Sequence, residues 1–298
     1  MKNYCFVFIC LVTSLQAFAQ IRSGRSNPIN VDYSPIPQEA TVAKNLGINS
    51  MPRYHALIIG VSEYQFAGPD LPNLEEPVKD AIRLKEVLYK KYFFNEEDIT
   101  VLTNPTREQI INELDRLINV VTSRDNLLIF YAGHGYYDKN SDLGFWLPSN
   151  AKSRSRADWI ANSTIKDYVR AINSKHTLLI TDACFAGSIF KTRTINTLDP
   201  RKFYELYRDK SRKAITSGNL SEVPDKSYFL EYLLRVLEEN EQDYLPASSL
   251  FARIYEPVLN NSPTVPQFGV IQQAGDEGGD FILIRRKENK EAAGASQK

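Results

Sequence analysis

The segment Asn126-Leu-Leu-Ile-Phe-Tyr-Ala-Gly-His-Gly135 joins an unbroken apolar run to a histidine flanked by glycines. A second apolar run, Thr177-Leu-Leu-Ile180, leads in the same way into Thr181-Asp-Ala-Cys184. Short continuous apolar runs are typical of strands that are buried on both faces of a parallel sheet. Because ligands of open parallel sheets bind at the carboxyl ends of the strands, the two polar endings predict a site there.

The segments around these two runs alternate between strand and helix patterns. Residues 55–61 and 99–102 are further apolar runs, and residues 78–91 carry apolar side chains at helical spacing. Thr106 and Gln109 form a capping-box pattern that predicts the start of another helix. The other expected elements are helices over 164–172, 227–239 and 247–259 and strands over 213–216 and 281–284. The alternation predicts an α/β fold with a mostly parallel central sheet that is flanked by helices on both faces.

The N-terminus has the order of a secretory signal over residues 1–19. Lys2 precedes a short apolar stretch from Tyr4 to Leu15, and Ala17-Phe-Ala19 fits the small-residue cleavage site. The stretch is shorter than the roughly 20 residues that a membrane span needs, although an uncleaved anchor is the alternative. We therefore expect export to a periplasm or to the extracellular space.

The composition of the chain is that of a globular protein without net charge. Its 36 basic residues balance 36 acidic ones, which gives no electrostatic reason to expect a nucleic-acid partner. No other stretch is apolar enough to cross a bilayer, so we expect no stable membrane insertion after signal removal. Residues 20–52 lack hydrophobic periodicity and are expected to form an extended leader, and residues 287–298 a disordered tail. Signal removal would leave Cys184 as the only cysteine.

His134 and Cys184 are the residue types that thiol-dependent peptide hydrolysis requires. A cysteine attacks a peptide carbonyl as the thiolate, and a nearby histidine can take its proton and return it to the leaving amine. The backbone N–H groups of Gly135 and Cys184 are candidates to stabilise the oxyanion. Taken separately, the histidine could belong to a turn and the cysteine could be a small buried hydrophobe. Their separation of 50 residues, with each after a core strand, favours a common site.

Tyr131-Ala-Gly-His-Gly135 and Asp182-Ala-Cys184 resemble the two signatures of the caspase, metacaspase and paracaspase superfamily. The resemblance covers about residues 53–285 and implies a caspase–haemoglobinase fold with a His–Cys dyad. Proteins or peptides would then be the substrates, and a homodimer is possible. The implied peptidase domain, residues 53–286, divides into a large-subunit-like part 53–189, a linker 190–211 and a small-subunit-like part 212–286.

The residue two positions before Cys184 is Asp182, where animal caspases have glutamine. In metacaspases and paracaspases the matching acid lines the pocket for the residue before the cleaved bond. The resemblance therefore implies a pocket of Asp182, Asp80 and Glu222, and cleavage after Arg or Lys, since carboxylates attract a cation and repel Asp. Alternatively, Asp182 caps backbone N–H groups at the strand end and Asp80 interacts with its helix dipole. Phe185 departs from the His that is common in metacaspases.

Some features have more than one interpretation. The basic linker 190–211 could be a site of self-cleavage or a solvated loop. No cofactor is expected, because no spacing resembles a zinc, phosphate-binding or calcium-loop motif, although calcium activation stays open. His55 and His176 lie at the starts of strands, at the opposite edge from Cys184, so structural roles are expected for them. The retained His134 and Cys184 favour an enzyme over the alternative, a catalytically silent peptide-binding domain.

Overall fold

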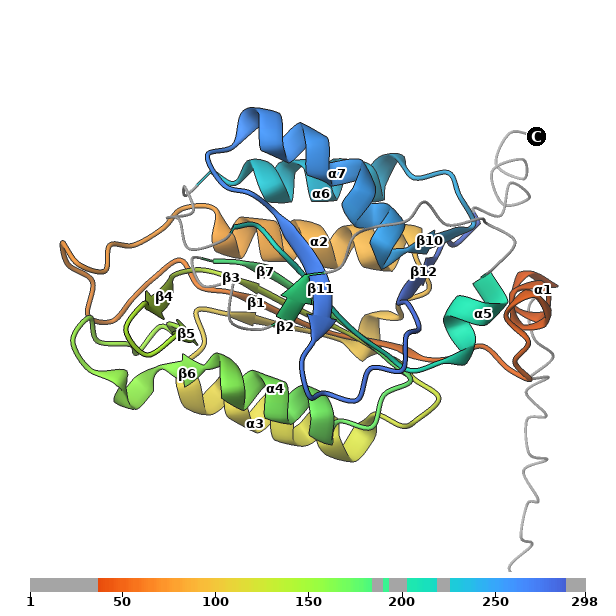
Figure 1. The fold of residues 1–298 in the computed structure, drawn as a ribbon, viewed down its shortest axis with the longest axis horizontal. Coiled ribbons are helices and arrows are strands. Elements are labelled where there is room, and N and C mark those ends of the chain that lie inside the picture. Colours follow the sequence, from red (N-terminus) through yellow and green to blue (C-terminus); the bar gives the residue numbers. More distant parts are fainter. Residues whose placement is uncertain (1–36, 184–189, 193–202, 219–225, 288–298) are drawn as a thin grey trace, which may run out of the picture. The chain divides into compact units, whose positions relative to one another are not determined.

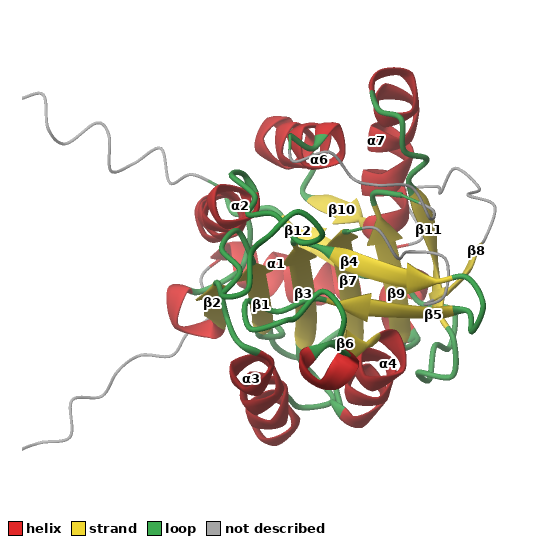
Figure 2. Cartoon of the chain, turned by 90° about the vertical axis from the view of Figure 1, so that its left-hand side faces the viewer, coloured by secondary structure: helices red, strands yellow, loops and turns green. Residues whose placement is uncertain are grey.

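The computed structural model describes residues 37–183, 190–192, 203–218 and 226–287. Within these residues a central sheet has the strand order β2-β1-β3-β7-β9-β11-β8 (Figures 1 and 2). Its strands β1, β2, β3, β7 and β9 are parallel, and β11 and β8 add antiparallel pairings at one side. The strands are β1 (Tyr54–Gly60), β2 (Ile99–Thr103), β3 (Asn126–Ala132), β7 (His176–Asp182), β8 (Phe190–Thr192), β9 (Ser211–Thr216) and β11 (Gln267–Ile271).

The three central strands β1, β3 and β7 are buried along their whole length. Successive side chains of a strand point to opposite faces, so each strand supplies apolar groups to two separate cores. Leu128 and Phe130 of β3 belong to one core, and Leu127 and Ile129 belong to the other. Each fully buried side chain of this size contributes about 1.5–3 kcal/mol to stability. The need to fill both cores explains why these strands have no polar alternation.

Helices cover both faces of the sheet (Figure 1). One core is closed by α2 (Pro77–Lys91), α6 (Tyr228–Glu239) and α7 (Ala247–Asn261). The other core is closed by α3 (Arg107–Val120) and α4 (Asn162–Ala171). Thr106 is the N-cap of α3, and its side chain forms the expected capping box with Gln109. The predicted α/β fold, with a mostly parallel sheet between helices, is confirmed.

Two smaller sheets lie outside the central one. The first has the order β4-β5-β6, formed by β4 (Gly135–Asp138), β5 (Leu143–Trp146) and β6 (Ile160–Ala161). It begins directly after β3 and lies beyond the carboxyl ends of the central strands, on the side of α4 (Figures 1 and 2). The second pairs β10 (Tyr244–Pro246) with β12 (Ile282–Ile284). The expected last strand, 281–284, therefore belongs to this two-stranded sheet.

Parts of the chain without a predicted regular pattern also form elements. The expected extended leader 20–52 contains the helix α1 (Pro37–Leu46), whose Val42 and Leu46 are buried. The expected linker 190–211 contains β8 and the short helix α5 (Phe203–Arg208), which contacts α1. The residues 1–19 of the predicted signal and the tail from 288 lie outside the described residues.

Gly60 fixes where α2 meets the sheet. A Cβ atom at this last residue of β1 would lie 2.6 Å from the carbonyl oxygen of Pro77 and 2.9 Å from Cα of Val78. Only glycine lets the first turn of α2 approach the strand so closely. The start of α2, with Asp80, is thereby held against the carboxyl end of the sheet.

Candidate active site

The parallel strands β3 and β7 end at the same edge of the central sheet, with their last residues paired. The two strands are neighbours, and Ala132 at the end of β3 pairs with Asp182 at the end of β7. His134 follows Ala132 by two positions, and Cys184 follows Asp182 by two positions. Cys184 itself lies outside the described residues, as does Glu222.

Two tyrosine hydroxyls hold the backbone of His134. The hydroxyl of Tyr64 accepts a hydrogen bond of 2.8 Å from the His134 N–H, and the hydroxyl of Tyr131 donates one of 2.7 Å to the His134 carbonyl. Gly133 has a φ of 151°, which favours glycine, and a Cβ there would lie 3.1 Å from the Tyr64 hydroxyl and Val61. The glycine before the histidine is therefore required by this turn.

The imidazole of His134 is oriented by a backbone carbonyl. Its Nε2 lies 2.8 Å from the carbonyl oxygen of Pro72, in the loop between β1 and α2. A carbonyl oxygen can only accept, so Nε2 carries the hydrogen and Nδ1 is the basic nitrogen of the neutral ring. The ring of Tyr64 packs at a centroid distance of 5.0 Å, and the backbone N–H of Tyr64 donates to Asn73 beside Pro72. The half-buried imidazole is thus set up to take a proton through Nδ1.

Asp182 is a buried carboxyl on the face of the sheet that α2, α6 and α7 cover. Ile180, two positions earlier on β7, belongs to the core under these helices, and the strand period places Asp182 on the same face. Burial raises the pKa of Asp182 to about 6, although the nearby hydroxyls of Ser217 and Ser227 oppose this rise. Among the described residues Oδ1 of Asp182 has no hydrogen-bond partner. The raised pKa therefore reflects burial that the two serine hydroxyls offset only in part.

Ser217 and Ser227 show what surrounds Asp182 on the side away from β3. Ser217 follows β9 and donates its backbone N–H to the carbonyl of Thr181 at 3.0 Å. Ser227 is the N-cap of α6 and accepts from the N–H of Leu230. The carboxyl of Asp182 thus lies between the end of β7, the end of β9 and the start of α6.

Asp80 lies at the same end of the molecule. It is buried in the first turn of α2, where its carboxylate is 3.6 Å from Nη1 of Arg83. Because α2 covers the face to which Asp182 points, both carboxyls lie on one face and near one edge of the sheet. The structure thus brings His134, Asp182 and Asp80 to the carboxyl edge, and Gly135 begins β4 beside them.

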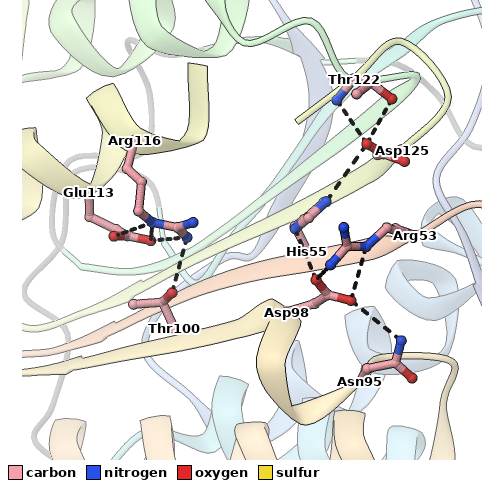
Figure 3. Close-up of polar contacts among 9 residues, drawn as sticks. All are labelled: Arg53, His55, Asn95, Asp98, Thr100, Glu113, Arg116, Thr122 and Asp125. Atoms are coloured by element: carbon pink, nitrogen blue, oxygen red, sulfur yellow. Dashed lines mark hydrogen bonds and ion pairs between the residues drawn. The ribbon is translucent and has the colours of Figure 1, made fainter. Parts of the chain in front are cut away.

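His55 and His176 lie at the opposite ends of their strands, as expected. Burial lowers the pKa of His176 to about 3, and its Nε2 lies 3.1 Å from the carbonyl oxygens of Tyr207 and Asp209. His55 is buried between Asp98 and Asp125 (Figure 3). Neither ring can reach the carboxyl edge, so neither can serve as a base there.

The supporting residues of this site were missed in the sequence. Tyr64 and Pro72 lie in a loop whose composition indicates only a turn, and a backbone carbonyl leaves no signal in a sequence. Tyr131 belongs to the run before His134 and to the signature quoted above, but neither pattern indicated that its hydroxyl donates to the His134 carbonyl. The position of Gly133 before the histidine was the one local signal that the turn is tight.

In residues 37–183, 190–192, 203–218 and 226–287, no three His, Cys, Asp or Glu side chains are grouped so that they could hold a metal ion. None of the helices in these ranges has the length and apolar character needed to cross a bilayer.

The chain is similar to known proteins over most of its length. It matches the caspase domain family, peptidase C14, over residues 53–273. It is 29% identical over 150 residues to Metacaspase-7 of Arabidopsis thaliana, which covers 45% of this chain and only 35% of the plant protein.

Two solved structures share the fold. Protein GSU0716 from Geobacter sulfurreducens has a TM-score of 0.51 at 15% identity, covering 77% of this chain and 100% of that protein. The Drosophila initiator caspase Dronc has a TM-score of 0.53 at 10% identity, covering 76% of this chain and 81% of the caspase. At such identities these likenesses bear on the fold alone.

Proposed function

The chain belongs to the caspase domain family, and from this premise we propose that it is a cysteine endopeptidase with Cys184 as nucleophile and His134 as general base. The family is one of cysteine peptidases, so proteins are the substrates that its domain implies. The observation that carries the proposal is the level pairing of Ala132 with Asp182. Because these two residues end neighbouring strands side by side, the segments that follow them start next to each other at one edge of the sheet. His134 and Cys184, each two positions further along the chain, can therefore meet.

In the proposed reaction, Nδ1 of His134 takes the thiol proton of Cys184, and the thiolate attacks the peptide carbonyl. The N–H groups of Gly135 and Cys184 stabilise the oxyanion, an effect worth about 3–4 kcal/mol per donor in other hydrolases. The carbon–nitrogen bond then breaks as His134 returns the proton to the leaving amine. Water, deprotonated by the same imidazole, hydrolyses the acyl-enzyme and restores the thiol.

We further propose that the enzyme cleaves after Arg or Lys, with Asp182 and Asp80 as the pocket acids and Glu222 as a third. The support is the buried carboxyl of Asp182, whose pKa burial raises to about 6 and whose Oδ1 has no hydrogen-bond partner among the described residues. A guanidinium or ammonium beside it would favour the ionised form and supply the missing hydrogen-bond partner. An aspartate side chain in the same place would add a second buried carboxylate, which repels the first.

Export is a separate proposal, which rests on the pattern of Lys2, the apolar stretch from Tyr4 to Leu15 and Ala17-Phe-Ala19. N-terminal sequencing of the protein recovered from a secreting host should find Gln20 as the first residue. Recovery of the intact N-terminus with the membrane fraction would support the uncleaved anchor instead.

The activity is tested with peptide reporters that end in Arg, Lys or Asp before the scissile bond. We expect the wild-type protein to cleave the Arg and Lys reporters, and Cys184→Ala to have no measurable turnover at an unchanged melting temperature. Turnover by the Cys184→Ala protein would contradict the mechanism. Cleavage of the Asp reporter alone would contradict the pocket, and binding of reporters without cleavage would favour the silent peptide-binding domain.

A further inference from the structure

Four side chains form an aromatic shelf on the small sheet whose first strand, β4, begins directly after His134. The shelf consists of Tyr136 on β4, Phe145 on β5, and Arg156 and Trp159 in the segment that leads to β6. Phe145 and Trp159 are buried, whereas Tyr136 is 42% exposed. An aromatic residue this exposed, two positions after a candidate catalytic histidine, is available to a bound peptide.

The shelf is rigidly built. Tyr136 packs on Trp159 at a ring-centroid distance of 4.9 Å, and Trp159 packs edge-on against Phe145 at 5.5 Å. Trp159 is anchored because its Nε1 donates a 3.0 Å hydrogen bond to the carbonyl of Lys152. The ring of Tyr136 is therefore backed on one side and held in place before any ligand arrives, which lowers the entropic cost of binding.

The positive charge of Arg156 on the shelf is neutralised by the neighbouring Asp138. The guanidinium of Arg156 lies over the rings of Phe145 and Tyr136, with centroid distances of 5.0 Å and 5.9 Å. It also forms a 2.6 Å ion pair with Asp138, and this interaction lowers the pKa of Asp138 to about 2. The pair stays ionised at neutral pH, so the shelf offers an apolar ring face rather than a site for an anion.

The position of the shelf matches the path of a substrate after the cleaved bond. His134 returns its proton to the leaving amine, so the leaving half of the peptide lies on the His134 side of the thiol. Tyr136 is two residues further along an extended strand, which corresponds to roughly 7 Å. This reach equals about two residues of extended peptide.

The two halves of a substrate would leave the thiol in different directions. Asp182 points to the face covered by α2 and α6 and lies toward β9, on the side of β7 away from β3. Phe145 and Trp159 belong to the core on the other face, and β4–β6 lie beyond the strand ends there (Figures 1 and 2). The residue before the cleaved bond and the residues after it thus meet different surfaces.

We propose that the aromatic shelf binds the first or second residue after the cleaved bond and selects a large apolar side chain there. This inference rests on the proposed peptidase function and adds the substrate class on the leaving-group side. The exposed ring of Tyr136 is the specificity-determining group, and Trp159 and Arg156 hold it in position.

Two internally quenched peptides test the proposal, identical up to an Arg and continuing with Leu-Leu or Gly-Gly. We expect wild-type kcat/KM to be about tenfold higher for Leu-Leu, since a half-buried leucine gains part of its transfer free energy. Tyr136→Ser should reduce this ratio to about twofold or less, and Tyr136→Phe should retain it, because the ring and not the hydroxyl makes the contact. Tyr89→Ser is the matched control, because Tyr89 on α2 is also 42% exposed, and its ratio should equal the wild-type ratio.

A wild-type ratio near one, or an unchanged ratio in Tyr136→Ser, would overturn the shelf proposal while leaving the peptidase function intact. Failure of the wild-type protein to cleave either peptide would instead contradict the proposed function, and the shelf proposal would fall with it. A melting temperature of Tyr136→Ser close to that of Tyr136→Phe shows that the comparison is between folded proteins.

Discussion

Histidines and buried aspartates lie at both ends of the central sheet, but the two ends differ in whether each buried carboxylate has a charged partner. At the amino end, Asp98 pairs with both Arg53 and His55, and Asp125 contacts His55 and accepts from Thr122 (Figure 3). Burial lowers the pKa of His55, and the two carboxylates oppose this shift. Each acid at this end has a partner, as a structural role requires.

At the carboxyl end Asp182 lacks such a charged partner, whereas Asp80 lies 3.6 Å from Arg83. Asp182 is as buried as Asp98, yet among the described residues no cation contacts it, and burial raises its pKa to about 6. Nε2 of the His134 ring lies 2.8 Å from the carbonyl oxygen of Pro72, and the residue stays half-exposed. This contrast is the one that the proposed binding of a basic substrate side chain beside Asp182 predicts.

The largest difference between the two ends should come from their histidines. His134→Ala should lower kcat by about 100-fold to 10,000-fold, because the general base is lost, with little change in stability. His55→Ala should do the opposite, since it leaves Asp98 and Asp125 without a shared partner and opens a cavity. We expect it to lower the free energy of unfolding by about 2 kcal/mol while the folded fraction keeps its kcat. Urea unfolding and steady-state kinetics of both variants measure this difference. A similar loss of kcat in both variants would contradict the separate roles of His134 and His55.

Substitution of the aspartates at the two ends should likewise affect activity at one end and stability at the other. Asp182→Asn keeps the shape of the side chain but removes its charge, so kcat/KM for Arg reporters should fall by about 100-fold. Asp98→Asn removes a carboxylate that pairs with Arg53 and His55, so it should lower stability and leave kcat/KM unchanged. If Asp182→Asn cleaved Arg reporters as well as the wild type, Asp182 would be a strand-end capping group.

The raised pKa of Asp182 also predicts how stability depends on pH. A folded-state pKa of about 6, above its ordinary 3.8, means that folding favours the protonated acid, and this stability is lost as pH rises through 6. Asp182→Asn resembles the protonated form, so it should match the wild type below about pH 4 and exceed it by up to about 3 kcal/mol above pH 7. Urea unfolding of both proteins at pH 4, 6 and 8 measures the difference. A wild type that is more stable than the variant at pH 8 would mean that a partner compensates the carboxylate.

The smallest expected effect concerns the tyrosine that holds His134. Tyr64→Phe removes the hydroxyl that accepts from the His134 N–H, and we expect kcat to fall about tenfold and stability by about 1 kcal/mol. Tyr92→Phe is the matched control, because its buried hydroxyl donates to the carbonyl of Leu237 away from the site. It should lose similar stability without a change in kcat. Equal kcat in the two variants would argue that Tyr64 does not position the imidazole.

Helices and strands that are marked by a short, continuous sequence pattern were predictable from the sequence. The unbroken apolar runs around Ile129 and Leu179 indicated buried strands, and the capping box at Thr106 indicated the start of α3. The helix α1 within the expected leader was not predictable in this way, because Val42 and Leu46 are buried only through packing against parts of the chain far away in sequence.

The same limit applies to the candidate site. The spacing of His134 and Cys184 predicted that they follow neighbouring strands, and the pairing of β3 with β7 agrees with this. The tautomer of His134 depends on the Pro72 carbonyl, 62 residues away in sequence, and the environment of Asp182 depends on where α6 begins. These features arise from tertiary packing, for which a single sequence carries no direct signal.

The most direct test of the account is covalent labelling with an Arg-terminated peptide that carries a thiol-directed acyloxymethyl ketone, followed by mass-spectrometric mapping. We predict a single adduct on Cys184 in the wild-type protein, much slower labelling in His134→Ala, and no adduct with the Asp-terminated analogue. Equal labelling of Cys184 in both proteins, or labelling by the Asp analogue alone, would contradict the claim that this imidazole and this thiol act together on a basic substrate.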